Sequence, residues 1–252
     1  MTKKLISRIA ELSVIGKEGH VPSALSILDI VWVIYNKIIN INLLKRRSRK
    51  RDFFILSKGH GCLAQYVVLE KKGIISKKDL NTFCKYKSNF GGHPDSNKIE
   101  GIECSTGSLG HGFPFAAGVA YGNKLLNIKS KVITLVGDGE CNEGSIWETC
   151  MIASHHKLNN LICIVDKNKS SDRALKIDDL KSKFKSFGWL AVNIDGHSQK
   201  EIFKALNIKS RKPLAIIANT IKGKGINFME NNPEWHHKNL NQDLFKKIIL
   251  KN

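Results

Sequence analysis

Four short runs of β-branched and aliphatic residues shape the second half of the sequence: KVITLV (131–136), LICIV (161–165), WLAVNI (189–194) and LAIIANT (214–220). Each of the first three is followed by a segment whose apolar residues recur at helical spacing. Short runs of this kind are typical of buried strands, and strands that alternate with helices form parallel sheets. The sequence therefore predicts an α/β fold with a parallel, doubly wound sheet flanked by helices.

The first half of the sequence carries a helical pattern. From Pro22 to about Lys124, apolar residues mostly recur at helical spacing, interrupted by glycine-bearing turns and by the short strand-like run FFIL at 53–56. A chain of 252 residues is long enough to bury a full core. Because no internal repeat or low-complexity linker divides it, we expect residues 1–252 to form a single domain with a helical N-terminal segment.

The composition is strongly basic, with 41 Lys and Arg against 22 Asp and Glu and a formal net charge of +19. Such a balance favours anionic partners, but the basic residues are scattered through most of the chain. The one dense run, KRRSRKR at 45–51, lacks the interleaved aromatic residues on which nucleic-acid bases stack. We interpret it as a solvated loop and expect no nucleic-acid partner.

The cysteines and the apolar segments indicate in which cellular compartment the chain is expected. The six cysteines form no CxxC pair and no ladder of short spacings, which argues against a zinc site and a disulfide framework. The N-terminus, MTKKLISRIAELSVIGKEG, has no apolar leader segment, and the longest apolar stretch, Val21–Tyr35, contains Asp29. We therefore expect reduced thiols, a cytoplasmic location and no membrane partner.

Two glycines flank a carboxylate directly after the first predicted strand, in Gly137-Asp138-Gly139. Glycines in a turn from strand to helix let the backbone approach a phosphate, but Asp138 would repel that phosphate unless a cation lay between them. The next predicted strand delivers Asp166, Lys167 and Asn168 to the same edge of the sheet. Carboxylate and amide oxygens at neighbouring strand ends predict a Mg²⁺ site of the diphosphate-bridging kind, which Ca²⁺ or Mn²⁺ also suits.

Two other interpretations compete with the cation site. A dinucleotide-binding GxGxxG motif would require glycine where Asn142 stands, so the nicotinamide interpretation fails. A purely structural interpretation, with Asp138 as a helix cap and Asn168 as a turn residue, suits either residue alone. It does not explain why both residues carry oxygen ligands at adjoining strand ends.

Several segments together resemble a known family. GDGECNEG, followed about thirty residues after its aspartate by the asparagine that ends LICIVDKN, resembles the thiamin diphosphate motif. Further segments are similar to the N-terminal half of transketolase, and in particular to the split transketolases whose halves are separate polypeptides. In order, these are RDFFILSKGHGCLAQY (51–66), GGHPD (91–95), ECSTGSLGHG (103–112), SFGW (186–189) and NTIKGKGINFMENNPEWHH (219–237). The resemblance implies that residues 1–252 are a thiamin diphosphate-binding domain.

The resemblance also implies roles for individual residues. Asp138, Asn168 and the main-chain carbonyl near Ser170 would bind the metal, and Gly137 and Gly139 would admit the diphosphate. His60 and His236 match histidines at the diphosphate and near the reacting carbon, with His237 left open as the alternative to His236. His20 and His93 match histidines that hydrogen-bond the sugar. The remaining matches are the backbone of Gly107, Ser108 and Leu109 at the aminopyrimidine, and Glu143 at a dimer interface.

The sequence departs from the family pattern at four places. The segment GHVPS, which contains the proposed substrate histidine His20, stands where the family usually has GHxGG. His111 replaces a glutamine, and the loop after Asn168 is several residues shorter than the pattern leads us to expect. His237 stands where the family commonly has glycine.

The activity that the resemblance implies is transfer of a two-carbon ketol unit from a ketose phosphate to an aldose phosphate, as in pentose phosphate chemistry. The family's activating glutamate belongs to a second, pyrimidine-binding domain. We therefore expect activity only with a separate C-terminal subunit in a heterotetramer, and self-association of the isolated chain. The alternatives are another thiamin diphosphate enzyme subunit of the 1-deoxy-xylulose-phosphate synthase type, a non-catalytic degenerate subunit, or a basic nucleic-acid-binding protein.

Overall fold

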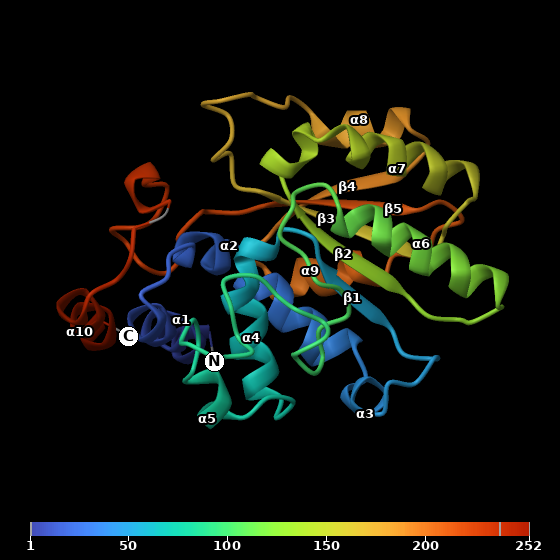
Figure 1. Cartoon of the computed structure of the whole chain (residues 1–252). Helices are drawn as coiled ribbons and strands as arrows, with labels where there is room; N and C mark the ends of the chain where they lie inside the picture. The colour runs from blue at the N-terminus through green and yellow to red at the C-terminus, as the bar shows by residue number, and fades with distance from the viewer. Residues whose placement is uncertain (1, 237, 252) are drawn as a thin grey trace.

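Parallel strands form the centre of the molecule in the computed structural model, which describes residues 2–236 and 238–251 (Figure 1). Within these residues the sheet has five strands in the order β1-β2-β3-β5-β4, and every neighbouring pair is parallel. The strands are β1 (Phe53–Leu56), β2 (Val132–Gly137), β3 (Leu161–Lys167), β4 (Leu190–Asp195) and β5 (Leu214–Asn219). This sheet confirms the predicted α/β fold, and each predicted run lies on a strand within two residues of its observed ends.

Helices cover both faces of the sheet, because the central strands bury their side chains on both faces. On one face lie α2 (Val21–Val33), α4 (Cys62–Lys71) and α9 (Gln199–Leu206). On the other face lie α6 (Gly112–Leu125), α7 (Gly144–His155) and α8 (Leu180–Ser186). The two faces carry separate hydrophobic clusters, so the core has two layers divided by the sheet.

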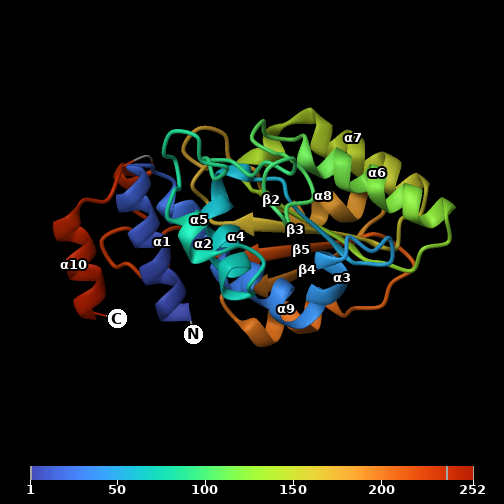
Figure 2. The same cartoon turned by 60° about the horizontal axis from the view of Figure 1, so that its bottom comes forward.

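The two ends of the described chain meet beside this assembly. Helix α1 (Thr2–Gly16) contacts α2, α4 and α10 (Gln242–Lys251), and Figure 2 shows α1 and α10 side by side at one end of the molecule. The remaining short helices lie in connections: η1 (Ile34–Ile38), α3 (Ile41–Lys45), η2 (Gly59–Gly61), α5 (Lys77–Leu80), η3 (Gly139–Asn142) and η4 (Pro233–Trp235).

Among the residues that the structure describes, one helical stretch, Val21–Ile38, is long and apolar enough to cross a membrane by length and composition. It corresponds to α2 and η1, and 83% of it is buried inside the structure. Because α2 packs between α1, α4 and α9, this burial is that of a core helix.

The basic run 45–51 lies between α3 and β1, and most of its side chains are exposed, as predicted. Arg51 differs: it lies 2.7 Å from Glu103 in an ion pair and stacks on the ring of Phe53. All six cysteines are free thiols.

The carboxyl ends of β2, β3 and β5 point to one edge of the sheet, where the connections after these strands meet the N-terminal turns of α2 and α4. Helix α2 starts there at His20, whose φ of 62° lies in the left-handed region. Because open parallel sheets bind ligands at this edge, the fold places the predicted site residues where a ligand site is expected.

Helix α6 offers a test of the second core layer. Phe113 is fully buried, and its ring centroid lies 5.8 Å from that of Trp189. Phe113→Ala should lower the free energy of unfolding by about 3–5 kcal/mol, because it leaves a cavity between α6 and the sheet. Phe115, two residues later, is 46% exposed, and Phe115→Ala should change it by less than about 0.5 kcal/mol. Urea unfolding of both variants measures the difference, and equal losses would contradict this placement of α6.

Candidate active site

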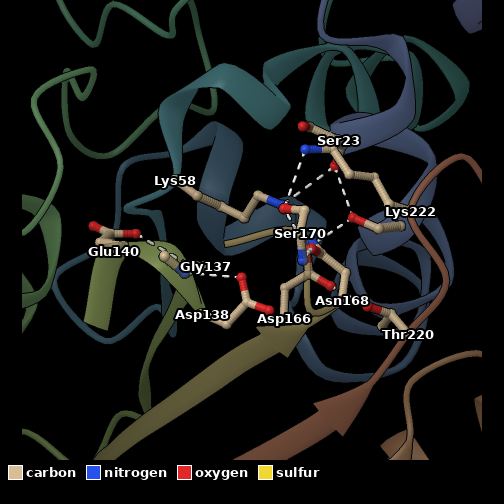
Figure 3. Close-up of polar contacts among 12 residues, drawn as sticks. Ser23, Lys58, Gly137, Asp138, Glu140, Asp166, Asn168, Ser170, Thr220 and Lys222 are labelled. Carbon is tan, nitrogen blue, oxygen red and sulfur yellow. Dashed lines mark hydrogen bonds and ion pairs between the residues drawn. The ribbon is translucent and has the colours of Figure 1, made fainter. Parts of the chain in front are cut away.

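Strand register brings the two predicted metal ligands together. Gly137 of β2 pairs with Asp166 of β3, and the amide of Asp138 donates to the carbonyl of Asp166 over 3.1 Å. Asp138 and Asn168 therefore follow neighbouring strand ends, as Figure 3 shows. The structure confirms the predicted placement of both residues at one edge, and it leaves their role as ligands to be tested.

Asp138 is a buried carboxylate, only 6% exposed. Its oxygens accept hydrogen bonds from the amides of Gly139 (2.8 Å) and Lys169 (2.5 Å). Burial and the nearby charge of Asp166 raise the pKa of Asp138 above its ordinary value, because both disfavour the charged form. A divalent cation beside this carboxylate would relieve both effects.

Asn168 presents its amide in a fixed orientation. Its nitrogen donates to Asp166 over 2.9 Å, which leaves Oδ1 on the other side, where it accepts from the amide of Ser170 over 3.0 Å. In the described part of the chain, no group of three or more His, Cys, Asp or Glu side chains could hold a metal ion. The donors expected here are not such a cluster: they are one carboxylate, one side-chain amide and one main-chain carbonyl. This set suits a Mg²⁺ ion whose other ligands are waters and phosphate oxygens.

Asp166 itself serves another purpose. It is fully buried and accepts hydrogen bonds from Lys58 Nζ (2.5 Å), Ser26 Oγ (2.7 Å) and the hydroxyl of Thr220. Burial alone would raise the pKa of Asp166, but the Lys58 ammonium and the hydroxyl donors hold it below its ordinary value. Asp166 is therefore an internal anion with its own counter-ion, Lys58, whose role no sequence pattern had indicated.

Three of the predicted histidines cluster at this edge. The His20 ring centroid lies 5.2 Å from that of His60 and 6.0 Å from that of His236. Burial, together with the positive charge of Lys58 and the neighbouring histidines, lowers the pKa of His60 to about 2. His60 is thus neutral near pH 7, so its ring both donates and accepts hydrogen bonds. The alternative residue, His237, lies outside the described residues.

Lys222 is a second lysine that the sequence analysis missed. It is 8% exposed, and its Nζ lies 2.9 Å from Nδ1 of His236 and 3.2 Å from Oγ of Ser170. Burial, followed by repulsion from Lys58, lowers the pKa of Lys222 to about 8. The only sequence signal for it was its place in NTIKGKG, one of the segments similar to transketolase.

A polar cavity of about 600 Å³ opens between the segments that follow β3 and β5. Its lining includes Asn168, Lys169, Ser170, Arg173, Lys222 and His236. Four of these six side chains are basic or imidazole groups, so the cavity suits an anion of diphosphate size.

The other predicted site residues lie elsewhere around this edge. A Cβ added at Gly107 would lie 3.3 Å from the His93 ring, so these two residues are in contact, and His93 is exposed. Among the described ring contacts none joins His93 to the other three histidines. Ser108 is exposed and Leu109 is half-buried. Glu143 is exposed at the N-terminus of α7, which is compatible with an interface and does not test it.

Comparison with known proteins points to the same family as the sequence motifs. The family model described as transketolase, thiamine diphosphate binding domain, matches residues 4–250. The chain is 34% identical to an apulose-4-phosphate transketolase subunit of Phocaeicola vulgatus, over 94% of this chain and 86% of that protein. It is 39% identical to the protein of the same name from Actinobacillus succinogenes, over 87% and 82%. It is 37% identical to human transketolase over 97% of this chain and 40% of that protein.

Solved structures give the same picture. A transketolase mutant from Pichia stipitis superimposes with a TM-score of 0.89 at 27% identity, covering 99% of this chain and 40% of that chain. Transketolase from Campylobacter jejuni does so with a TM-score of 0.86 at 31% identity, covering 99% and 41%. The chain therefore spans about two fifths of the solved transketolases that it matches, and most of the length of the two apulose-4-phosphate transketolase subunits. The predicted family and fold are confirmed.

The lowered pKa of Lys222 predicts how anion binding depends on pH. Lys222 is charged below about pH 8 and neutral above it. Its attraction for a bound anion is therefore present at pH 7 and is lost as the pH rises. Binding of inorganic diphosphate with Mg²⁺, measured by calorimetry, should weaken by about tenfold between pH 7 and pH 9 through this group.

The matched variants separate Lys222 from the titration of diphosphate itself. Lys222→Met should bind diphosphate more weakly at pH 7 and lose this part of the pH dependence. Lys224→Met changes a more exposed lysine of the same segment and should keep the wild-type profile. A profile of Lys222→Met that matches the wild type would contradict this assignment.

Proposed function

This chain belongs to the transketolase family through its thiamine diphosphate-binding domain, and we propose that it is the N-terminal subunit of a split transketolase. In this role it would transfer a two-carbon ketol unit between sugar phosphates together with a C-terminal subunit. Its relatives are named transketolase or transketolase subunit, and transketolases are transferases, which supports the predicted enzyme class.

The observation that carries this proposal is the meeting of Asp138 and Asn168 at adjoining strand ends, next to a basic cavity. The two oxygen ligands and the Ser170 carbonyl would hold Mg²⁺, or Ca²⁺ or Mn²⁺ in its place. Gly137 and Gly139 would admit the diphosphate, and Lys222 and His60 would face its negative charge.

When bound, thiamine diphosphate supplies the electron sink that allows a ketose carbon–carbon bond to break. The chain's own residues would position the reactants and manage protons. A neutral His60 can donate a hydrogen bond to a diphosphate oxygen without adding charge. His20 and His93 would hydrogen-bond the hydroxyl and carbonyl oxygens of the sugar, and His236 would lie near the reacting carbon. An imidazole can give or take a proton at these positions near neutral pH.

The names of two relatives support a separate partner, because each is called a transketolase subunit and this chain covers most of its length. We propose that a C-terminal subunit supplies the pyrimidine-binding domain and its activating carboxylate, in a heterotetramer of two copies of each chain. Glu143, exposed at the start of α7, would lie at the interface. The six free thiols support the proposal of a reducing, cytoplasmic location.

Two alternatives remain as outcomes of experiment. A subunit of the 1-deoxy-xylulose-phosphate synthase type would react with different carbonyl substrates, and the transketolase names of the relatives disfavour it. A degenerate subunit would keep the fold and bind no cofactor.

Complementation tests the proposed function. The full chain, supplied with Mg²⁺, thiamine diphosphate, a ketose phosphate and an aldose acceptor, should show no transfer by itself, because the activating carboxylate comes from the partner. Adding the partner subunit purified from the native cell should produce transfer, measured as the new ketose formed. Full activity of the lone chain would contradict the split-enzyme assignment, and no transfer with the partner present would support a degenerate subunit.

A double-mutant cycle tests the shared cation. Asp138→Ala and Asn168→Ala should each weaken Mg²⁺ binding about ten- to hundredfold in the presence of thiamine diphosphate, measured by calorimetry. The double variant should bind Mg²⁺ only slightly more weakly than the single variant with the larger loss, because the same ion is lost in each case. Asp195→Ala removes an exposed carboxylate at the end of β4 and serves as the control. Independent, additive losses would contradict a shared ion.

A further inference from the structure

A third buried carboxylate, Glu140, lies beside the site and has no part in the roles described above. We propose that Glu140 is a positioning residue that holds three separate turns at the spacing that the cofactor requires. The proposal rests on the proposed function, because the three turns are those assigned to cofactor contact.

The carboxylate of Glu140 joins three distant segments. Its Oε1 accepts from Ser57 Oγ (2.5 Å) and from the amide of Gly110 (2.9 Å), and its Oε2 accepts from the amide of Gly137 (3.1 Å). The side chain is 1% exposed, and Figure 3 shows it directed toward Gly137. One side chain therefore fixes three turns, the most distant of which, at Ser57, lies 83 residues before Glu140 in the sequence.

Each of these turns carries a residue of the candidate site. Ser57 precedes Lys58 and His60, Gly110 closes the turn that contains residues 107–109, and Gly137 precedes Asp138. A shift of any one turn would move a group assigned to the diphosphate, the aminopyrimidine or the cation.

The surrounding backbone leaves these turns little freedom. Gly110 has a φ of +79°, and a Cβ added there would lie 2.4 Å from Ser145 Oγ. A Cβ at Gly112 would lie 2.7 Å from the Cα of Ser57. The turn before α6 therefore contacts the turn after β1 at a distance that only glycine permits, and Glu140 lies at this contact.

The chemistry of Glu140 points to positioning rather than to metal binding. Asp138, two residues earlier, accepts from Gly139 and Lys169, whereas Glu140 accepts from Ser57, Gly110 and Gly137. Both oxygens of Glu140 are thus taken up by donors on a different side of the turn. A buried carboxylate without a hydrogen-bonded cation costs the fold free energy, whereas an apolar side chain of similar volume would not. The contribution of the carboxylate is that one rigid group accepts hydrogen bonds from three donors.

Glu140→Gln tests the proposal at constant volume. The single amide oxygen can still accept from Ser57 and Gly110, but the amide nitrogen then faces the amide of Gly137, donor against donor. In the opposite orientation the amide oxygen accepts from Gly137 and the Ser57 hydroxyl can turn to accept from the amide nitrogen, but that nitrogen then faces the amide of Gly110, donor against donor. Either way, the turn at 137–139 is released from at least one of the others. The matched control is Glu148→Gln, which makes the same change on the exposed surface of α7.

Two measurements test the role of Glu140 separately from the proposed function. The first is amide hydrogen exchange of the full chain without ligand: in Glu140→Gln, exchange should rise in segments 57–60, 107–112 and 137–139 and stay unchanged in β4 and α9. The second is binding of thiamine diphosphate with Mg²⁺, to the chain alone and with its partner, which should weaken about tenfold in the same variant. In the assembled enzyme, saturating cofactor should restore kcat, because Glu140 touches no reacting atom.

The outcomes are distinct. Unchanged exchange in the three segments, or an unchanged cofactor affinity, would overturn the role of Glu140. Uniformly raised exchange across the sheet would also overturn it, because Glu140 would then stabilise the fold as a whole. A wild-type chain that binds no thiamine diphosphate even with its partner would overturn the proposed function and, with it, the role of Glu140 toward the cofactor. Ser57→Ala, which keeps both amide donors, should show the same pattern with a smaller change.

Discussion

The parallel pairing of β2 with β3 is the constraint on which the candidate site depends. Because Gly137 lies opposite Asp166, the chain that leaves each strand turns over the same edge, and Asp138 and Asn168 come together without any contact between distant loops. A shift of one residue in this register would exchange the faces of the strand and direct Asn168 away from Asp138. The buried apolar side chains on both faces of β2 and β3 oppose such a shift, so the packing of the core also fixes the geometry of the site.

The balance of charges at this edge of the sheet is the second constraint on the candidate site. Asp166 and Lys58 neutralise each other in a site that excludes water, and the amide of Asn168 is oriented by the same carboxylate. Asp138 instead accepts its hydrogen bonds from main-chain amides, and Lys222 stands with a lowered pKa beside His236. A divalent cation beside Asp138 and a diphosphate beside Lys222 would supply the opposite charges at these two groups.

The sequence predicted the parts of this arrangement that depend on local patterns. Strand runs have a short apolar signature, and residues directly after strand ends fall at one edge of a parallel sheet, so Asp138 and Asn168 were predicted together. Lys58, Lys222 and Glu140 were missed because a charged residue in a turn is usually exposed, and its burial depends on segments far away in the chain. The clustering of His20, His60 and His236 likewise depends on tertiary contacts, and only the roles of these three residues were predicted, through the resemblance of three separated segments to one family.

The central proposal is that Asp138 and Asn168 would bind one cation together with a diphosphate. Anomalous X-ray diffraction from crystals of the chain with its partner, grown with Mn²⁺ and thiamine diphosphate, tests it most directly. The account predicts an anomalous peak coordinated by the Asp138 carboxylate and by Oδ1 of Asn168, with diphosphate oxygens completing the shell next to Gly137 and Gly139. A Mn²⁺ peak without contact to these two side chains, or a diphosphate bound away from the ends of β2 and β3, would contradict it.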